Sequence, residues 1–333
     1  MKLKPIQVAK FGARTLVTGL IAYWLFLQID PETVAAEMAR VHEGAIVGIV
    51  ALILACTIVP QAWRWRLIVR GLHAHLRLLP AIRMVFLSMF VNQVVPGSVS
   101  GDVSRVWLGR SEGIAIRALI GSVILDRLAG LTAILLLCVA GLPILHIIAG
   151  DDSFFWAALG LVVVGTSAVV LFFSLPLMPQ WLRDIRFVAD VVAYSRSAGS
   201  LGRRPGMVGA ILSLSLLPHV AAITSAAVLA NQLEVSLGFA GAAAILPPIL
   251  LAAMLPISFA GWGVREGAMV LGLALVGVPS ATAIAISVLW GTTNLIVGIV
   301  GGLGWLLIRP QPLGLAVAAE MKDETESIGG GAP

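Results

Sequence analysis

Two ten-residue segments of this chain share a pattern that is unusual inside apolar sequence. Residues 96–105 and 256–265 both read P-x-S-x-x-G-x-x-x-R, and Glu266 directly follows the second copy. Proline interrupts helices, and arginine and carboxylate side chains are costly in hydrocarbon. Two such copies in a membrane protein indicate two broken helices that meet at a polar site, as in transporters built from inverted repeats.

Ionisable residues gather in or near sequence that we expect at membrane depth. They are Asp102, Arg105, Asp126, Arg127, Arg265 and Glu266. Their formal charges sum to zero, which favours mutual pairing over isolated ions. Residues 102 and 105 are three apart and can pair locally. Adjacent residues on a helix point about 100° apart, so we expect the pairs 126–127 and 265–266 to find partners elsewhere, across the two motifs.

These residue types suggest the chemistry of anion binding. An arginine fork beside the open amides of a broken helix suits a phosphate, such as that of a phospholipid head group. We predict that the arginines bind an anionic head group, that the carboxylates balance them and that the serines form hydrogen bonds. The predicted substrate-binding residues are Arg105, Arg265, Arg127, Asp102, Asp126, Glu266, Ser98 and Ser258. The alternative is that these ion pairs only lock the motifs to a long helix.

The composition is that of an all-α integral membrane protein. The mean hydropathy is +1.00, and only 12% of the residues are charged, well below the share in a soluble domain. Long apolar runs recur along the chain, so we predict one polytopic domain over residues 1–310 and a disordered cytoplasmic tail over 311–333. The net charge is +5, and the basic residues lie between the apolar runs. This distribution favours contact with anionic lipid over nucleic acid.

The apolar runs also predict a topology of about six spanning helices. These cover roughly residues 15–29, 44–63, 118–149, 154–175, 207–230 and 281–307. Lys2 and Lys4 precede the first span, and Arg64, Arg66 and Arg70 follow the second. Because basic residues favour the cytoplasmic side, both termini are expected inside, in a bacterial inner membrane.

The runs beside the two motifs are too short to cross a bilayer. Residues 84–95 would extend about 18 Å as a helix, against a hydrocarbon core of about 30 Å. We predict a re-entrant hairpin there, and a second one, over residues 238–278, that opens from the opposite side. A full crossing by residues 238–256 is the alternative.

Two further features concern polar and small residues inside the predicted spans. His219 follows Pro218, and it either couples a proton to transport or forms a hydrogen bond beside a proline kink. Small residues on one face of the last span predict close helix packing; they are Ser287, Gly291, Asn294, Gly298 and Gly302. The sequence has no catalytic triad, nucleotide-binding loop or zinc signature, so we expect no cofactor, no metal and no enzyme activity.

The chain resembles the membrane region of the lysylphosphatidylglycerol synthase family, also described as flippase-like. The resemblance rests on residues 92–97, Gly101-Asp102 with Arg105, Asp126-Arg127 and residues 255–266. In the larger members of that family, a soluble domain transfers an amino acid from aminoacyl-tRNA to phosphatidylglycerol, and the membrane region moves the product lipid between leaflets. With 333 residues, this chain is expected to be the membrane part alone.

The resemblance and the motifs together favour a lipid flippase that moves an anionic or modified phospholipid between leaflets. One alternative is a membrane partner without transport activity that presents a lipid-linked substrate to a separate glycosyltransferase or synthase. Another is an intramembrane enzyme in which Asp126 or Glu266 acts as a general acid or base.

Overall fold

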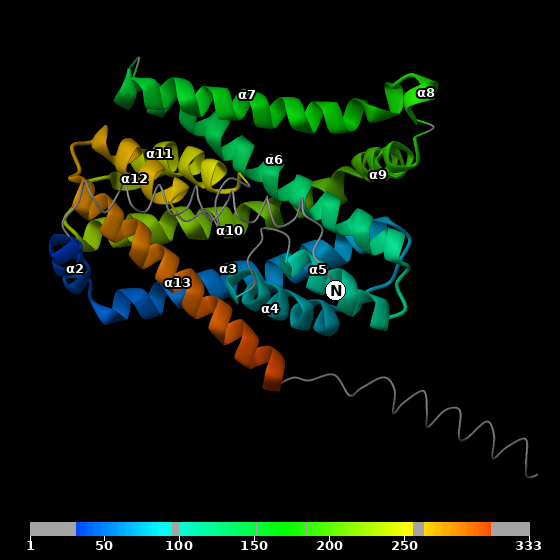
Figure 1. Cartoon of the computed structure of the whole chain (residues 1–333), viewed down its shortest axis with the longest axis horizontal. Helices are drawn as coiled ribbons and strands as arrows, with labels where there is room; N and C mark the ends of the chain where they lie inside the picture. The colour runs from blue at the N-terminus through cyan, green and yellow to red at the C-terminus, as the bar shows by residue number, and fades with distance from the viewer. Residues whose placement is uncertain (1–30, 95–99, 151, 184, 256–262, 308–333) are drawn as a thin grey trace, which may run out of the picture.

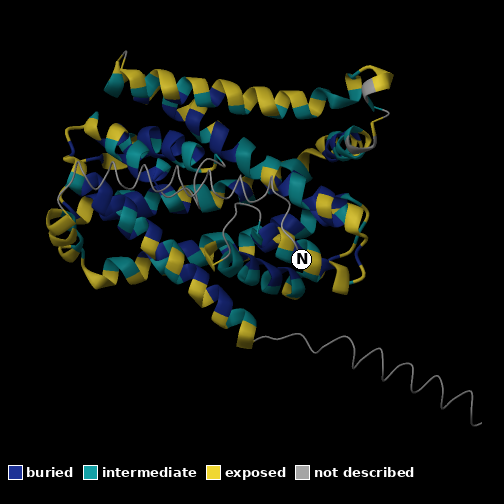
Figure 2. Ribbon diagram, in the orientation of Figure 1, coloured by how far each residue is buried: buried dark blue, intermediate teal, exposed yellow. Residues whose placement is uncertain are grey.

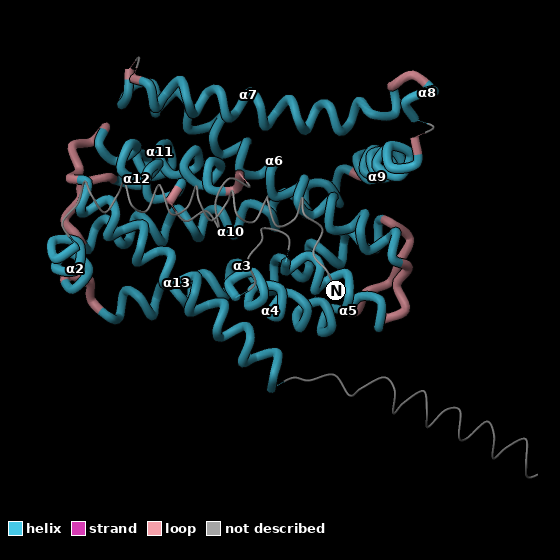
Figure 3. Tube along the Cα trace, in the orientation of Figure 1, coloured by secondary structure: helices cyan, strands magenta, loops and turns pink. Residues whose placement is uncertain are grey.

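A computed structural model describes residues 31–94, 100–150, 152–183, 185–255 and 263–307. Within these ranges the chain is helical and contains no strand (Figures 1 and 3). An all-helical membrane protein is what the sequence predicts, because a helix satisfies every backbone polar group within one segment. The predicted span 15–29 and the predicted tail 311–333 lie outside the described residues.

Five helices are long and apolar enough to cross a bilayer. They are α3 (Glu43–Gly71), α6 (Ile116–Ala149), α7 (Ser153–Ser174), α10 (Pro205–Gln232) and α13 (Ser280–Leu307). The shortest has 22 residues, about 33 Å of helix, which covers the hydrocarbon core. The protein is therefore a multi-pass membrane protein, and these helices correspond to the other five predicted spans.

The second span differs from its prediction at its C-terminal end. We expected it to end near residue 63, with Arg64 and Arg66 in a basic surface stretch, but α3 continues to Gly71. Arg64 is only 6% exposed, and Arg66 donates from Nε to the backbone oxygen of Leu76 at 3.1 Å. The reason is that Arg64 has a buried carboxylate partner, described below, so the helix can continue past a charged residue.

Two helical hairpins flank the motifs, of which residues 96–99 and 256–262 lie outside the described residues. The first pairs α4 (Leu78–Val94) with α5 (Ser100–Ser111), and the second pairs α11 (Gly238–Ala253) with α12 (Val264–Ala274). Helix α11 has 16 residues, about 24 Å of helix, which is shorter than the hydrocarbon core. This length favours a hairpin over the full crossing by residues 238–256, although the position of either hairpin in a bilayer stays a prediction.

The two hairpins enter the helix bundle from opposite ends. Helix α4 follows the C-terminal end of α3 after a short loop, and α11 follows the end of α10. The end of α10 lies at the start of α3, because the His42 backbone N–H donates to Gln232 at 3.4 Å and Arg40 pairs with Glu234 at 3.1 Å. The outer ends of the hairpins are thus separated by the length of α3, as Figure 1 shows.

Close packing joins α13 to α4, as the small-residue face predicts. A Cβ added at Gly298 would lie 2.6 Å from Gln93, and one at Gly302 would lie 2.6 Å from Phe90. At Gly301 the nearest atom would be the backbone oxygen of Phe86, at 2.7 Å. Glycine is therefore needed at these three positions, and the prediction of a packing face is confirmed for this part of α13.

The remaining helices lie at the periphery. These are α2 (Pro31–Ala39), α8 (Gln180–Arg183) and the amphipathic α9 (Arg186–Gly202). The buried side chains concentrate where α10, α11, α12 and α13 meet (Figure 2). Helix α7 buries only Ala158 and Val162, and its exposed apolar side chains are those of a lipid-facing helix.

The close contact between α4 and α5 gives a first prediction. A Cβ added at Gly101 would lie 2.4 Å from the backbone oxygen of Ser88. Because backbone must move to relieve this clash, Gly101→Ala is expected to destabilise the protein by about 1–3 kcal/mol in thermal unfolding measured in detergent. Gly160→Ala on α7 is the control, since nothing lies within 4 Å of that position. Equal melting temperatures for the two variants would contradict the prediction.

Candidate functional site

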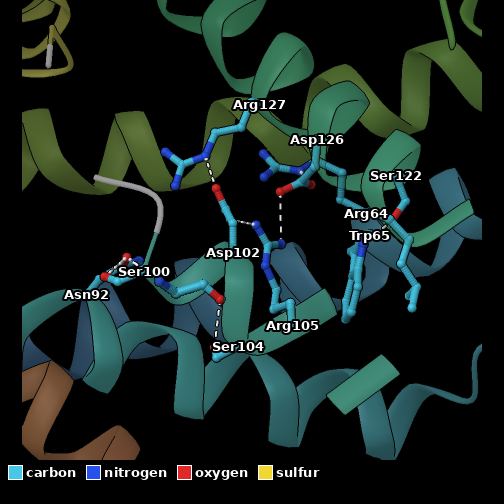
Figure 4. Close-up of polar contacts among 12 residues, drawn as sticks. Arg64, Trp65, Asn92, Ser100, Asp102, Ser104, Arg105, Ser122, Asp126 and Arg127 are labelled. Atoms are coloured by element: carbon cyan, nitrogen blue, oxygen red, sulfur yellow. Dashed lines mark hydrogen bonds and ion pairs between the residues drawn. The ribbon is translucent and has the colours of Figure 1, made fainter. Parts of the chain in front are cut away.

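A network of five charged side chains lies at the inner end of the first hairpin, where α5 begins (Figure 4). Asp126 on α6 accepts from Arg64 Nε at 2.7 Å through one oxygen and from Arg105 at 3.0 Å through the other. Asp102 on α5 accepts from Arg105 through one oxygen and from Arg127 Nε at 2.7 Å through the other. The local pairing of residues 102 and 105 is confirmed, and Asp126 and Arg127 do find partners on other segments as expected.

Most charged side chains of this network are buried, so each of them needs an oppositely charged partner. Asp102, Arg105 and Asp126 are each at most 3% exposed, whereas the Arg127 side chain is 49% exposed. Removing an ion from water costs several kcal/mol, so such charges persist only with well-aligned opposite charges and hydrogen bonds. Three arginines face two carboxylates, which leaves the described network with a formal charge of +1.

Arg64 is the member that the sequence analysis missed. It also donates to Ser215 on α10 at 3.1 Å, so it joins α3 to two other spanning helices. Thr57, Gln61 and Arg64 recur at intervals of four and three residues, which places them on one helix face. That polar stripe inside an apolar span was the available signal.

The end of α4 positions the start of α5. The backbone N–H of Gly101 donates to Asn92 Oδ1 at 2.9 Å, and the Ser100 hydroxyl lies 3.3 Å from the same oxygen. This bond holds the first turn of α5, and therefore Asp102, against α4. Asn92 thus caps the start of α5.

Arg265 and Glu266 form a second, separate cluster at the start of α12. Arg265 donates to Glu266 Oε1 from Nε at 3.0 Å and from a terminal nitrogen at 2.5 Å. Ser287 on α13 bridges both side chains at 3.0 Å. The prediction that these two residues pair across the motifs was therefore wrong.

The pairing of Arg265 with its neighbour Glu266 has a local cause. The second carboxylate oxygen of Glu266 accepts from the backbone N–H of Gly263 at 2.5 Å, which folds the glutamate back over the first turn of α12. Gly263 has φ +88°, a conformation that other residues rarely adopt. With its carboxylate turned toward the helix start, Glu266 comes within reach of its neighbour Arg265.

The terminal arginines of the two motifs nevertheless have equivalent surroundings. Arg105 lies over the ring of Trp65 and Arg265 over the ring of Trp290, each at 5.2 Å from the ring centroid. Each arginine is buried, pairs with a carboxylate and contacts a tryptophan from a spanning helix. This correspondence agrees with an internal repeat of one structural unit.

Two adjoining cavities connect the clusters. The first, of about 200 Å³, is lined by the five-residue network together with Gln61, Ser88, Asn92 and Ser215. The second, of about 320 Å³, is lined by Arg265, Trp290 and Asn294 and by apolar residues. Both cavities share four lining residues, which are Thr57, Pro218, His219 and Met254.

The predicted site residues thus fall into three groups. Asp102, Arg105, Asp126 and Arg127 line the first cavity and Arg265 lines the second, while Glu266 lies behind Arg265 as its partner. Ser98 and Ser258 lie outside the described residues. The arrangement offers guanidinium donors inside a partly apolar enclosure, which suits an anionic ligand.

Comparison with known protein families matches residues 12–302 to the lysylphosphatidylglycerol synthase TM region. The match includes both hairpins and both charged clusters. No curated protein matches the chain.

Asp126 accepts hydrogen bonds from two buried arginines, so its substitution is expected to have a large effect on stability. Asp126→Asn removes one acceptor from between two buried arginines, and is expected to destabilise the protein by about 3–5 kcal/mol in chemical unfolding. The control is Asp190→Asn, because that residue forms a longer pair of 3.7 Å with the exposed Arg117. Its expected cost is under about 1 kcal/mol. A small effect of both substitutions would show that the buried network does not hold the helices.

Proposed function

Because this chain belongs to the lysylphosphatidylglycerol synthase TM region family, we propose that it moves a lipid with an anionic head group between the two leaflets. The observation that supports this most strongly is the pair of adjoining cavities with buried arginines on both sides of a shared wall. A purely structural ion network needs no cavity beside it.

The first cavity provides the donors for a phosphate. Its described charges sum to +1, so a phosphodiester with one negative charge would neutralise it. The Nε atom of Arg105 is buried and has no hydrogen-bond partner among the described residues. Arg127 is half-exposed and therefore reachable from outside the bundle.

The second cavity provides a continuation of the path. Its residues Thr57, Pro218, His219 and Met254 also line the first cavity, so the two spaces adjoin, and in this proposal the head group passes from one to the other past these four side chains. The first cavity takes most of its hairpin residues from α4 and α5, the second takes most of them from α11 and α12, and the two hairpins enter from opposite ends of the bundle. Small movements of either hairpin would then open the path toward one leaflet at a time.

Leaflet exchange in reconstituted vesicles tests the proposal. Vesicles of phosphatidylcholine with fluorescent phosphatidylglycerol are prepared with and without the protein, and the label accessible from outside is followed over time. Faster exchange in the protein-containing vesicles is expected. If phosphatidylglycerol and other phospholipids exchange no faster than in empty vesicles, the proposal fails. Lipid-dependent association with a glycosyltransferase or synthase would then favour the presenting role instead.

Arg127 allows a matched test of head-group binding. Arg127→Gln removes a charge from the cavity wall and is expected to slow phosphatidylglycerol exchange at least tenfold, equivalent to about 1.4 kcal/mol. Arg117→Gln is the control, because it lies on the same helix and also pairs with an aspartate, but at the exposed surface. Equal slowing by both variants would contradict a specific role for the cavity.

A further inference from the structure

His219 occupies the wall between the two cavities. It lies on α10 directly after Pro218, and it lines both cavities. Among the described residues that line these cavities, it is the one whose side chain ordinarily titrates near neutral pH. This position makes it a candidate for more than packing beside a proline.

A hydrogen bond fixes which ring nitrogen can accept a proton. His219 Nε2 lies 3.1 Å from the backbone oxygen of Gly130 on α6. A carbonyl oxygen can only accept, so Nε2 donates and the neutral ring has its lone pair on Nδ1. Protonation at Nδ1 therefore leaves the bond to Gly130 intact. The ring can change charge without losing its attachment to α6.

The charges that face His219 disfavour its protonation in the empty site. They are Arg64 on α3, Asp102 and Arg105 on α5, Asp126 and Arg127 on α6, and Arg265 on α12. With Glu266 beside Arg265, the described charges sum to +1. The described lining residues from α4, α11 and α13 add no ionisable group. A protonated histidine would raise this charge to +2 in a setting of low dielectric.

An anionic head group reverses this balance. A phosphodiester brings the described charge from +1 to zero, so a proton on Nδ1 then meets no net repulsion. Binding of the anion and binding of the proton therefore strengthen each other, and the coupling is reciprocal. We propose that His219 takes up a proton when an anionic head group occupies the cavities, so that lipid and proton cross together. This inference rests on the proposed function and adds its energy source.

The proton balance of the cycle is simple. Water on one side supplies a proton to Nδ1 as the head group enters, and the ring becomes an imidazolium with two N–H donors. When the head group leaves on the other side, the positive cavity favours loss of that proton to water there. One negative and one positive charge cross together, so the step is electroneutral. No bond of the lipid is broken.

A pH gradient across vesicles provides the test in the wild-type protein. Because the lipid and the proton move together, labelled phosphatidylglycerol is expected to accumulate in the leaflet that faces the more alkaline solution. For one proton per lipid, the limiting ratio is about tenfold per pH unit. A pH-sensitive dye inside the vesicles should report proton movement that depends on the anionic lipid.

Two variants separate titration from structure. His219→Gln keeps a donor for the Gly130 oxygen but does not titrate near neutral pH, so whatever exchange remains should give equal leaflet populations at any gradient. His146→Gln is the control, because His146 lies in the last turn of α6 and contacts Phe155. This variant should behave like the wild type.

The outcomes distinguish the two proposals. Wild-type exchange with equal populations under a gradient, and without proton movement, overturns the role of His219 and leaves the proposed function standing. The same result follows if His219→Gln keeps the gradient-driven asymmetry. Absence of any wild-type exchange overturns both.

Discussion

A charge inside hydrocarbon must be neutralised where it lies, and the arrangement of helices around Asp126 follows from that constraint. Its two oxygens bind arginines from α3 and α5, and one of those arginines also contacts α10. The four helices α3, α5, α6 and α10 are thus held by bonds to a single carboxylate and its partners. Apolar packing alone would tolerate many relative positions of these helices, whereas bonds between buried ions tolerate few.

In the second cluster, the buried arginine and carboxylate that neutralise each other are adjacent in sequence. Glu266 turns back to the start of α12 and neutralises the neighbouring arginine, and Ser287 on α13 hydrogen-bonds to both side chains. Ion pairs thus join α5 of the first hairpin to α6, and through Asp126 to α3, whereas the ion pair between Arg265 and Glu266 lies within α12 itself.

The apolar runs and the helix-breaking motifs were sufficient to predict most of the fold. Spanning segments follow from length and hydropathy, and the opposed hairpins follow from runs too short to cross. The partner of each charge did not follow, because pairing depends on helix rotation and on local backbone. Arg64 appeared to end a span when only its neighbours in sequence were considered. Glu266 was assigned a distant partner because the turn at Gly263 could not be anticipated from helical spacing alone.

For the candidate site too, one part could be predicted from the sequence and another part came only from the structure. The sequence predicted a set of charged residues for the site, and the structure places five of them beside two cavities that share lining residues, His219 among them. The central claim is that these cavities hold an anionic lipid head group. Native mass spectrometry of the wild-type protein, released from bilayers of equal phosphatidylglycerol and phosphatidylcholine, measures this directly. The account predicts one retained phosphatidylglycerol per chain. Equal retention of both lipids, or of neither, would contradict it.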